Sequence, residues 1–215
     1  NPGYTGQVLL NGNVVELRNP SVAKKLGIEI VYQEVDMALF PAQTVAENIM
    51  MNELITGMER KVAINWNHIR SAARETLRRL HIDIDENKQV GELSLAQKQL
   101  VLIARALVSA SQNILLDEPC SALDLGNQQV VLQLIGDLAH RQARTVLFTT
   151  HDPNHALQVA SHTLLLLPEG RWLAGETADV LSETHLRQAY GLPVRLIRHA
   201  ASAFPLLAPG FTLRR

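Results

Sequence analysis

The most informative segment of the sequence is Asn113-Ile-Leu-Leu-Asp-Glu-Pro119, followed by Ser121-Ala-Leu-Asp124. Its apolar residues predict a short buried strand that Pro119 ends. Two carboxylates, Asp117 and Glu118, therefore stand at the carboxyl end of a strand, where open α/β sheets bind their ligands. Asp117 offers the hard oxygen ligands that suit Mg²⁺, and Glu118 can orient or deprotonate a water molecule. Taken alone, the pair fits a simple acidic turn equally well.

Strands and helices alternate on both sides of this segment. Further buried strands are predicted at Ile28–Tyr32, Thr145–Thr150 and Thr163–Leu167. Apolar residues recur at helical spacing in two stripes: Trp66, Ile69, Ala73, Leu77 and Leu80, and then Val130, Leu134 and Leu138. This alternation predicts an α/β fold with a mainly parallel sheet and helices packed on it.

Local signals predict where several elements begin and turn. Asn11-Gly12-Asn13 predicts an antiparallel N-terminal hairpin over residues 7–17, because tight hairpin turns need positive φ. Thr44 with Glu47 and Ser94 with Gln97 are capping boxes, so each pair predicts the start of a helix.

Composition excludes several classes of protein. The 215 residues are 47% hydrophobic and 19% charged, which fits a globular domain rather than a disordered chain. The net charge of −1 provides no overall basic field for nucleic acid. The single cysteine, Cys120, allows no internal disulfide. The longest aliphatic run, Leu164 to Leu167, is far below the ~20 residues that span a bilayer. We therefore expect a soluble, cytoplasmic protein, with any membrane role peripheral.

A histidine follows a second predicted strand. Phe148-Thr-Thr-His151 ends that strand, and Asp152 with Pro153 then predicts a helix start. His151 and His155 have the spacing of a helical zinc pair, but a helix that begins after His151 puts the two rings on different faces. His151 is better placed to hydrogen-bond a developing charge.

Together these motifs resemble the ABC-type ATPases, the ATP-binding subunits of ABC transporters. The order and spacing match the family's signature motif at Leu93 to Gln97, its Walker B strand at Asn113 to Pro119 and its D-loop at Ser121 to Asp124. His151 resembles the switch histidine, and Gln33 resembles the glutamine of the Q-loop.

The resemblance implies a fold and a set of roles. The fold is a P-loop NTPase-like ABC ATPase core with a helical subdomain. Gln33 and Asp117 would serve Mg²⁺ and the attacking water, Glu118 would be the general base, and His151 would contact the γ-phosphate. The residues implied to contact ATP held on a partner subunit are Ser94, Ala96, Gln97 and Asp124. We expect the side chains assigned to Mg²⁺, water and the γ-phosphate to converge on one pocket; they are Gln33, Asp117, Glu118 and His151.

One family motif is absent. No stretch matches G-x-x-x-x-G-K-[ST], and residues 1–7 contain no lysine. Such a loop cradles the β-phosphate with backbone amides, and its lysine neutralises charge. Residues 7–17 resemble family sequence just after the P-loop helix, so we expect the P-loop and the first strand to be missing from the N-terminus. This chain alone should bind ATP poorly and hydrolyse it negligibly. Leu95 and Ala96 also stand where the signature usually has glycines.

The predicted organisation is one ABC ATPase domain over residues 1–199, lacking its P-loop segment, with a helical subdomain over about 50–110 and an irregular tail over 200–215. The two halves resemble different importers. Gly27 to Asn48 and Glu92 to Gln99 are similar to monosaccharide importers, whereas the chain from Leu100 onward is similar to importers of metal chelates, siderophores or cobalamin.

Three functions compete, and the sequence favours the first. The first is the ATP-binding subunit of an importer of sugar or metal chelate. Its partners would be transmembrane permease subunits and a second ATPase subunit, in a homodimer or heterodimer at the inner face of the cell membrane, with residues 33–48 in the groove for the permease. The second is an ATPase acting on nucleic acid or ribosomes, which the near-neutral charge disfavours. The third is a non-catalytic module that lends Ser94 and Asp124 to a complete ATPase.

Overall fold

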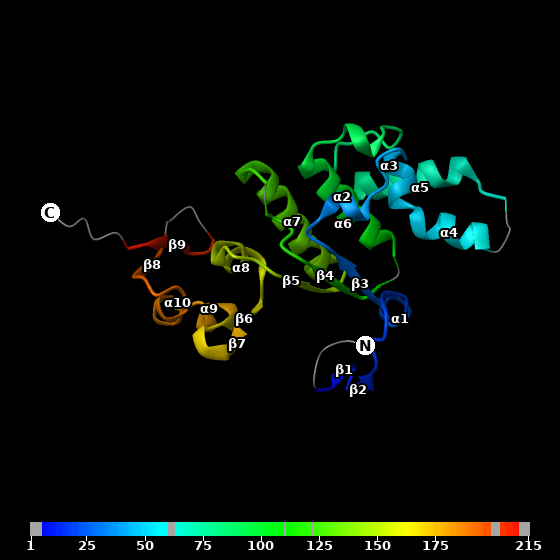
Figure 1. Cartoon of the computed structure of the whole chain (residues 1–215). Helices are drawn as coiled ribbons and strands as arrows, with labels where there is room; N and C mark the ends of the chain where they lie inside the picture. The colour runs from blue at the N-terminus through cyan, green and yellow to red at the C-terminus, as the bar shows by residue number, and fades with distance from the viewer. Residues whose placement is uncertain (1–5, 60–62, 110, 122, 199–202, 211–215) are drawn as a thin grey trace.

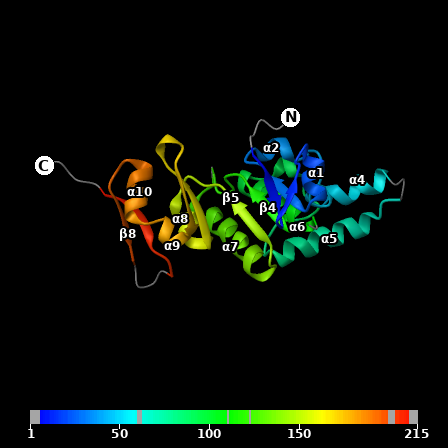
Figure 2. The same cartoon turned by 90° about the horizontal axis from the view of Figure 1, so that it is seen from below.

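The computed structural model describes residues 6–59, 63–109, 111–121, 123–198 and 203–210. Figure 1 shows the helices α3, α4 and α5 on one side of a small central sheet and the C-terminal elements on the other. The view from below in Figure 2 gives the same arrangement.

The central sheet is parallel, as predicted. Its strand order is β3 (Ile28–Val31), β4 (Asn113–Leu116) and β5 (Thr145–Phe148). In β4 every second side chain, Ile114 and Leu116, is fully buried, which is why this apolar segment forms the middle strand. The three carboxyl ends therefore lie side by side.

Helices cover one face of this sheet and enclose the main core. They are α3 (Val45–Ile49), α5 (Trp66–Arg79), α6 (Leu95–Val108) and α7 (Leu125–Arg141), with α4 (Met51–Glu59) beside them. The remaining short elements of this half are α1 (Pro20–Lys25), α2 (Val35–Ala38) and η1 (Val90–Glu92). Two members of the predicted stripes, Trp66 and Val130, are exposed instead of buried: Trp66 is the first residue of α5, and Val130 lies at the margin of the core-facing side of α7.

Both predicted capping boxes are confirmed. Thr44 Oγ1 accepts a hydrogen bond from Glu47 N at 3.2 Å, while Glu47 Oε2 accepts one from Thr44 N at 2.7 Å. Ser94 Oγ accepts from Gln97 N at 3.3 Å and Gln97 Oε1 accepts from Ser94 N at 3.1 Å. Asp152 likewise caps α8 (Pro153–Val159), whose first residue is proline.

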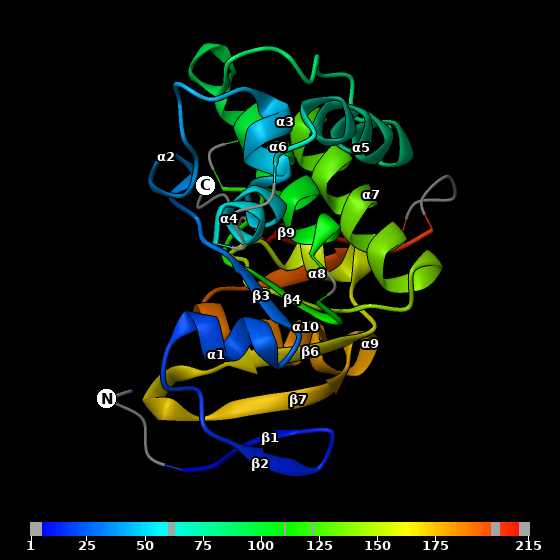
Figure 3. The same ribbon diagram turned by 90° about the vertical axis from the view of Figure 1, so that its right-hand side faces the viewer.

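The N-terminal hairpin is confirmed, and so is a strand near Thr163–Leu167, but not its burial or its place in the parallel sheet. The predicted burial also fails for β5, whose residues are half-buried or exposed. β1 (Val8–Leu10) pairs with β2 (Asn13–Val15), and both turn residues have positive φ, 52° at Asn11 and 78° at Gly12. Thr163–Leu167 does not join the parallel sheet. Because the η2 turn (Pro168–Gly170) reverses the chain, β6 (His162–Leu166) instead pairs antiparallel with β7 (Trp172–Glu176). Every second side chain of β6 is exposed. Figure 3 shows this hairpin below the central sheet.

The C-terminal part forms a second small core. α9 (Thr177–Val180), α10 (Glu183–Tyr190) and β8 (Val194–Ile197) pack with α8 around Leu181 and Leu186. The tail predicted to be irregular over 200–215 contains β9 (Leu206–Pro209), which pairs antiparallel with β8. For Leu206–Pro209 the segment is therefore not irregular, because strand pairing satisfies a backbone that has no periodicity of its own, while residues 200–202 and 211–215 lie outside the described residues.

Within the described residues, no helix combines the length and the apolar character needed to cross a bilayer.

Candidate functional site

The site lies where the three parallel strands end. β3 leads to Gln33, β4 leads to Asp117 and Glu118, and β5 leads through Thr149 to His151. Backbone bonds hold these ends together, since Asp117 N donates to Val31 O at 2.9 Å and Thr149 N donates to Leu116 O at 3.0 Å. The parallel register therefore positions the predicted side chains at one edge.

A Glu118 carboxylate oxygen contacts His151 Nε2, and the contact is an ion pair whenever the imidazole carries its second proton. The Glu118 side chain is 19% exposed and the His151 side chain is 90% exposed. The backbone φ of Glu118 is 44°, in the left-handed region that residues other than glycine rarely adopt. Such strain is typical of functional sites, where the surroundings hold a side chain in a set direction.

Thr149 connects Asp117 with Glu118, a role that its sequence context does not indicate. Its Oγ1 donates to Asp117 Oδ1 at 2.8 Å and accepts from Glu118 N at 2.9 Å. Threonines are common at strand ends, so only the register of β4 with β5 reveals this one.

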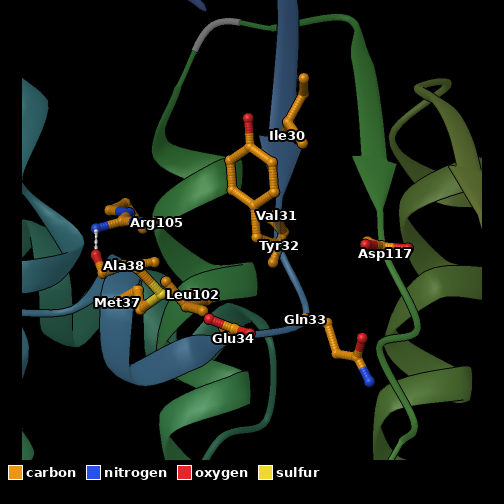
Figure 4. Close-up of a pocket in the computed structure, with 10 residues that line it drawn as sticks. All are labelled: Ile30, Val31, Tyr32, Gln33, Glu34, Met37, Ala38, Leu102, Arg105 and Asp117. Carbon is orange, nitrogen blue, oxygen red and sulfur yellow. Dashed lines mark hydrogen bonds between the residues drawn. The ribbon is translucent and has the colours of Figure 1, made fainter.

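Gln33 and Asp117 line a cavity of about 540 Å³, shown in Figure 4. Gln33 Nε2 donates to Ser121 Oγ at 3.3 Å, which connects the end of β3 with the segment after β4. The other residues around the cavity are Ile30, Val31, Tyr32, Glu34, Met37, Ala38, Leu102 and Arg105.

Helix α2 forms the other wall of this cavity and is fastened to α6. Arg105 Nη1 donates to Ala38 O at 2.7 Å, and Lys98 Nζ lies 2.7 Å from Asp36 Oδ1. Burial lowers the pKa of Arg105 from its ordinary value, and the charge of Glu29 acts in the opposite direction.

The four residues implied to contact a partner's ATP lie on other elements. Ser94, Ala96 and Gln97 form the start of α6, and Asp124 caps α7 by accepting from Asn127 N at 2.9 Å. These bonds lower the pKa of Asp124. Among the described residues, no hydrogen bond or ion pair joins any of the four to Gln33, Asp117, Glu118 or His151.

Cys120 is buried beside the site. Burial, with a smaller contribution from Asp152, raises the pKa of its thiol to about 11. The thiol is therefore neutral near pH 7 and acts as a small apolar side chain.

The donor set fits Mg²⁺ but not a complete triphosphate. The Asp117 carboxylate and the free Oε1 of Gln33 are oxygen ligands, and Mg²⁺ typically takes one or two carboxylates and fills its other positions with phosphate oxygens and water. No glycine-rich loop with a lysine occurs in the 215 residues to cradle a β-phosphate.

Known proteins share this fold and parts of this sequence. The family profile of the ABC transporter matches residues 1–121. The chain belongs to the ABC transporter family. The matched range includes β3, β4 and the Asp117–Glu118 pair.

Among curated ABC relatives, the molybdate import ATP-binding protein MolC of Haemophilus influenzae is 43% identical over 128 residues, or 60% of this chain and 50% of that protein. The xylose import ATP-binding protein XylG of Geobacillus kaustophilus is 31% identical over 184 residues, or 85% of this chain and 35% of that protein. The chain thus spans half or less of the length of these relatives.

Solved ABC structures share the fold. An inward-facing metal-chelate type ABC transporter aligns with a TM-score of 0.70 and 35% identity, over 86% of this chain and 72% of that one. The dimeric ATP-binding cassette MJ0796, bound to ADP and Pi after hydrolysis, aligns with a TM-score of 0.61 and 27% identity, over 74% and 68%.

Proposed function

We propose that this chain is the ATP-binding part of an ABC importer and that its strand-end site handles the γ-phosphate and Mg²⁺. The ion pair between Glu118 and His151, beside the Asp117–Thr149 bond, is the observation that carries the proposal. Its partners would be a transmembrane permease and a second ATPase subunit, at the inner face of the cell membrane. The curated relatives import molybdate and xylose, so the cargo class is a small solute.

Each residue of the site then has a chemical task. Mg²⁺, when bound, would neutralise charge on the phosphate oxygens. Asp117 and Gln33 would hold that ion, and Thr149 fixes the direction of the Asp117 carboxylate. Glu118 would accept a proton from the attacking water. His151 keeps Glu118 aimed and is exposed enough to donate to a phosphate oxygen.

The chain alone should bind ATP weakly and turn it over negligibly, because it contains no loop to cradle the β-phosphate. Domain limits of 1–199, with a helical subdomain over about 50–110, stay part of the proposal.

Mn²⁺ in place of Mg²⁺ tests the site without requiring turnover. In ¹⁵N spectra of the full chain with millimolar ATP, Mn²⁺ should first broaden the amide signals of Gln33, Asp117 and Thr149 to His151. Asp117→Asn should remove this selective broadening. Asp179→Asn, which changes an exposed carboxylate on α9, is the matched control and should leave it intact. Selective broadening that survives in Asp117→Asn would refute the assignment.

A second function is favoured by one feature, the exposed N-terminus of α6. Its capping serine, Ser94, stands at the start of a 14-residue helix whose dipole favours an anion. The chain could therefore lend Ser94 and Asp124 to a complete ATPase without hydrolysing ATP itself. Mixing it with an intact ABC ATPase separates the two functions. Turnover that rises on mixing and falls with Ser94→Ala, but not with Glu118→Gln, would favour lending.

A further inference from the structure

Helix α8 joins the strand-end site to the C-terminal core. His151 and the capping residue Asp152 immediately precede it. Ala156 on α8 is buried in the C-terminal core, while Val159 at its other end packs against the main core. Figure 1 shows α8 between α7 and the C-terminal strands. Any movement of the C-terminal elements relative to the sheet would therefore displace the segment that carries His151.

Two side chains connect this segment to the C-terminal elements. The Asn154 side chain makes two hydrogen bonds to the backbone of β9. Its Oδ1 accepts from Leu207 N at 2.6 Å, and its Nδ2 donates to Leu207 O at 3.5 Å. Tyr190, the last residue of α10, donates its hydroxyl to the carbonyl oxygen of His151 at 3.4 Å. Burial, and to a lesser degree Asp152, raises the pKa of Tyr190, so its hydroxyl keeps the proton it donates.

Hydrogen bonds hold the C-terminal elements together, so the contacts of Asn154 and Tyr190 can fix the position of the His151 backbone. Glu183 Oε1 accepts from Leu196 N at 2.8 Å, which fastens α10 to β8. Gly210 N donates to Pro193 O at 2.7 Å at the end of the β8–β9 pairing. By contrast, the His151 ring is almost fully exposed, and its ion pair with Glu118 depends on where its backbone is held.

We infer that Asn154 and Tyr190 are positioning residues, through which α10 and β9 hold His151 against Glu118. This inference rests on the proposed function of the strand-end site. Neither side chain is assigned contact with ATP, Mg²⁺ or water. Each acts on the backbone around His151, so its loss should reduce the share of molecules in which the ion pair forms, while the sheet and its core stay folded.

Ring-¹⁵N-labelled histidine in the full chain provides the measurement. At one fixed pH, His151→Gln identifies the His151 signal and Glu118→Gln gives its position without the ion pair. Tyr190→Phe, which deletes one oxygen, should move the His151 signal toward that position, and so should Asn154→Ala. The signals of His68, His81 and His140, which lie outside α8, α10 and β9, should not move, and the melting temperature should be nearly unchanged in Tyr190→Phe.

Two further variants separate positioning from general stability. Asn154→Asp keeps the acceptor of the 2.6 Å bond and should restore most of the wild-type shift. Gln158→Ala removes a reciprocal amide pair with Gln129, which connects α8 to α7 rather than to the C-terminal core, and should leave His151 unmoved. An equal displacement in Gln158→Ala would overturn the inference.

The outcomes also distinguish this inference from the proposed function. If Glu118→Gln does not move the His151 signal, the ion pair is absent in solution and the catalytic proposal fails. If Glu118→Gln moves it but Tyr190→Phe does not, only the positioning inference fails. If Asn154→Ala unfolds the protein, Tyr190→Phe and Asn154→Asp still test whether these side chains position His151.

Discussion

Glu86 is a buried acidic residue with two side-chain partners, Arg74 and Asn87, whose Nδ2 donates to Glu86 Oε1 at 3.1 Å. Its Oε1 accepts a hydrogen bond from Arg74 Nε at 3.0 Å, across the gap between α5 and the segment before η1. This bond lowers the pKa of Glu86 below its ordinary 4.5, although burial acts in the opposite direction. The charged form of Glu86 is therefore preferred in the folded protein.

We expect Glu86→Gln to destabilise the protein at pH 7 and to matter much less in acid. A carboxyl with a lowered folded-state pKa stabilises the fold above its unfolded value of 4.5, and that contribution disappears as the pH falls through the folded pKa. Urea unfolding of both proteins at pH 7 and pH 3 measures the difference. A stability gap that widens in acid would contradict the assignment.

At the scale of single residues, sequence could predict which side chains gather but not what holds them. Glu118 and His151 each follow a predicted strand, so parallel pairing alone brings them to one edge. The bridge made by Thr149 depends on side-chain direction and on the strand register. The contact of Tyr190 with His151 joins residues 39 positions apart and has no local signal.

Among the elements, the loop between α2 and α3 is held by a fully buried asparagine. Asn48 Oδ1 accepts from Phe40 N at 2.9 Å, and its Nδ2 donates to Phe40 O at 3.1 Å and to Thr44 O at 3.0 Å. The Asn48 amide thus takes the place of backbone hydrogen bonds within this loop and fixes the path of residues 40–44 into α3.

Asn48→Ala should cost about 2 kcal/mol or more, because it removes three hydrogen bonds of a fully buried amide and leaves the N–H of Phe40 without its partner. Asn67→Ala is a matched control: Asn67 Oδ1 accepts only from an exposed arginine on its own helix, and the change should stay within about 0.5 kcal/mol. Chemical denaturation of the two variants compares them directly. Equal small effects would mean that water replaces the Asn48 bonds.

Elements with local signals were predicted well, and elements defined by their partners were not. Capping boxes and the Asn11-Gly12 turn act within a few residues, so the sequence contains the whole signal. The apolar run at Thr163–Leu167 predicts a strand but not its partner or its exposure. β9 acquires its structure only by pairing with β8.

Across the whole molecule, two sheets leave an apolar face uncovered. On the central sheet Ile30, Leu115 and Leu147 are aligned in register, and Leu147 on the edge strand β5 is 60% exposed. On the β6–β7 hairpin the opposed pair Leu166 and Trp172 is 72% and 63% exposed. Exposed apolar surface of this kind promotes association.

A charge on the uncovered face should improve solubility without loss of stability. Leu166→Lys should reduce binding of the dye ANS and change the unfolding free energy by less than about 0.5 kcal/mol. Leu165→Lys, one residue away, points the charge into the C-terminal core and should cost at least about 2 kcal/mol. The reverse order of stabilities would show that the hairpin faces are exchanged.

The left-handed backbone at Glu118 sets stability against chemistry in this fold. Glycine adopts that conformation at no steric cost, so a search for heat-resistant variants would favour glycine there and discard the carboxylate. The carboxylate at this costly position is what the proposed role of Glu118 as a general base requires.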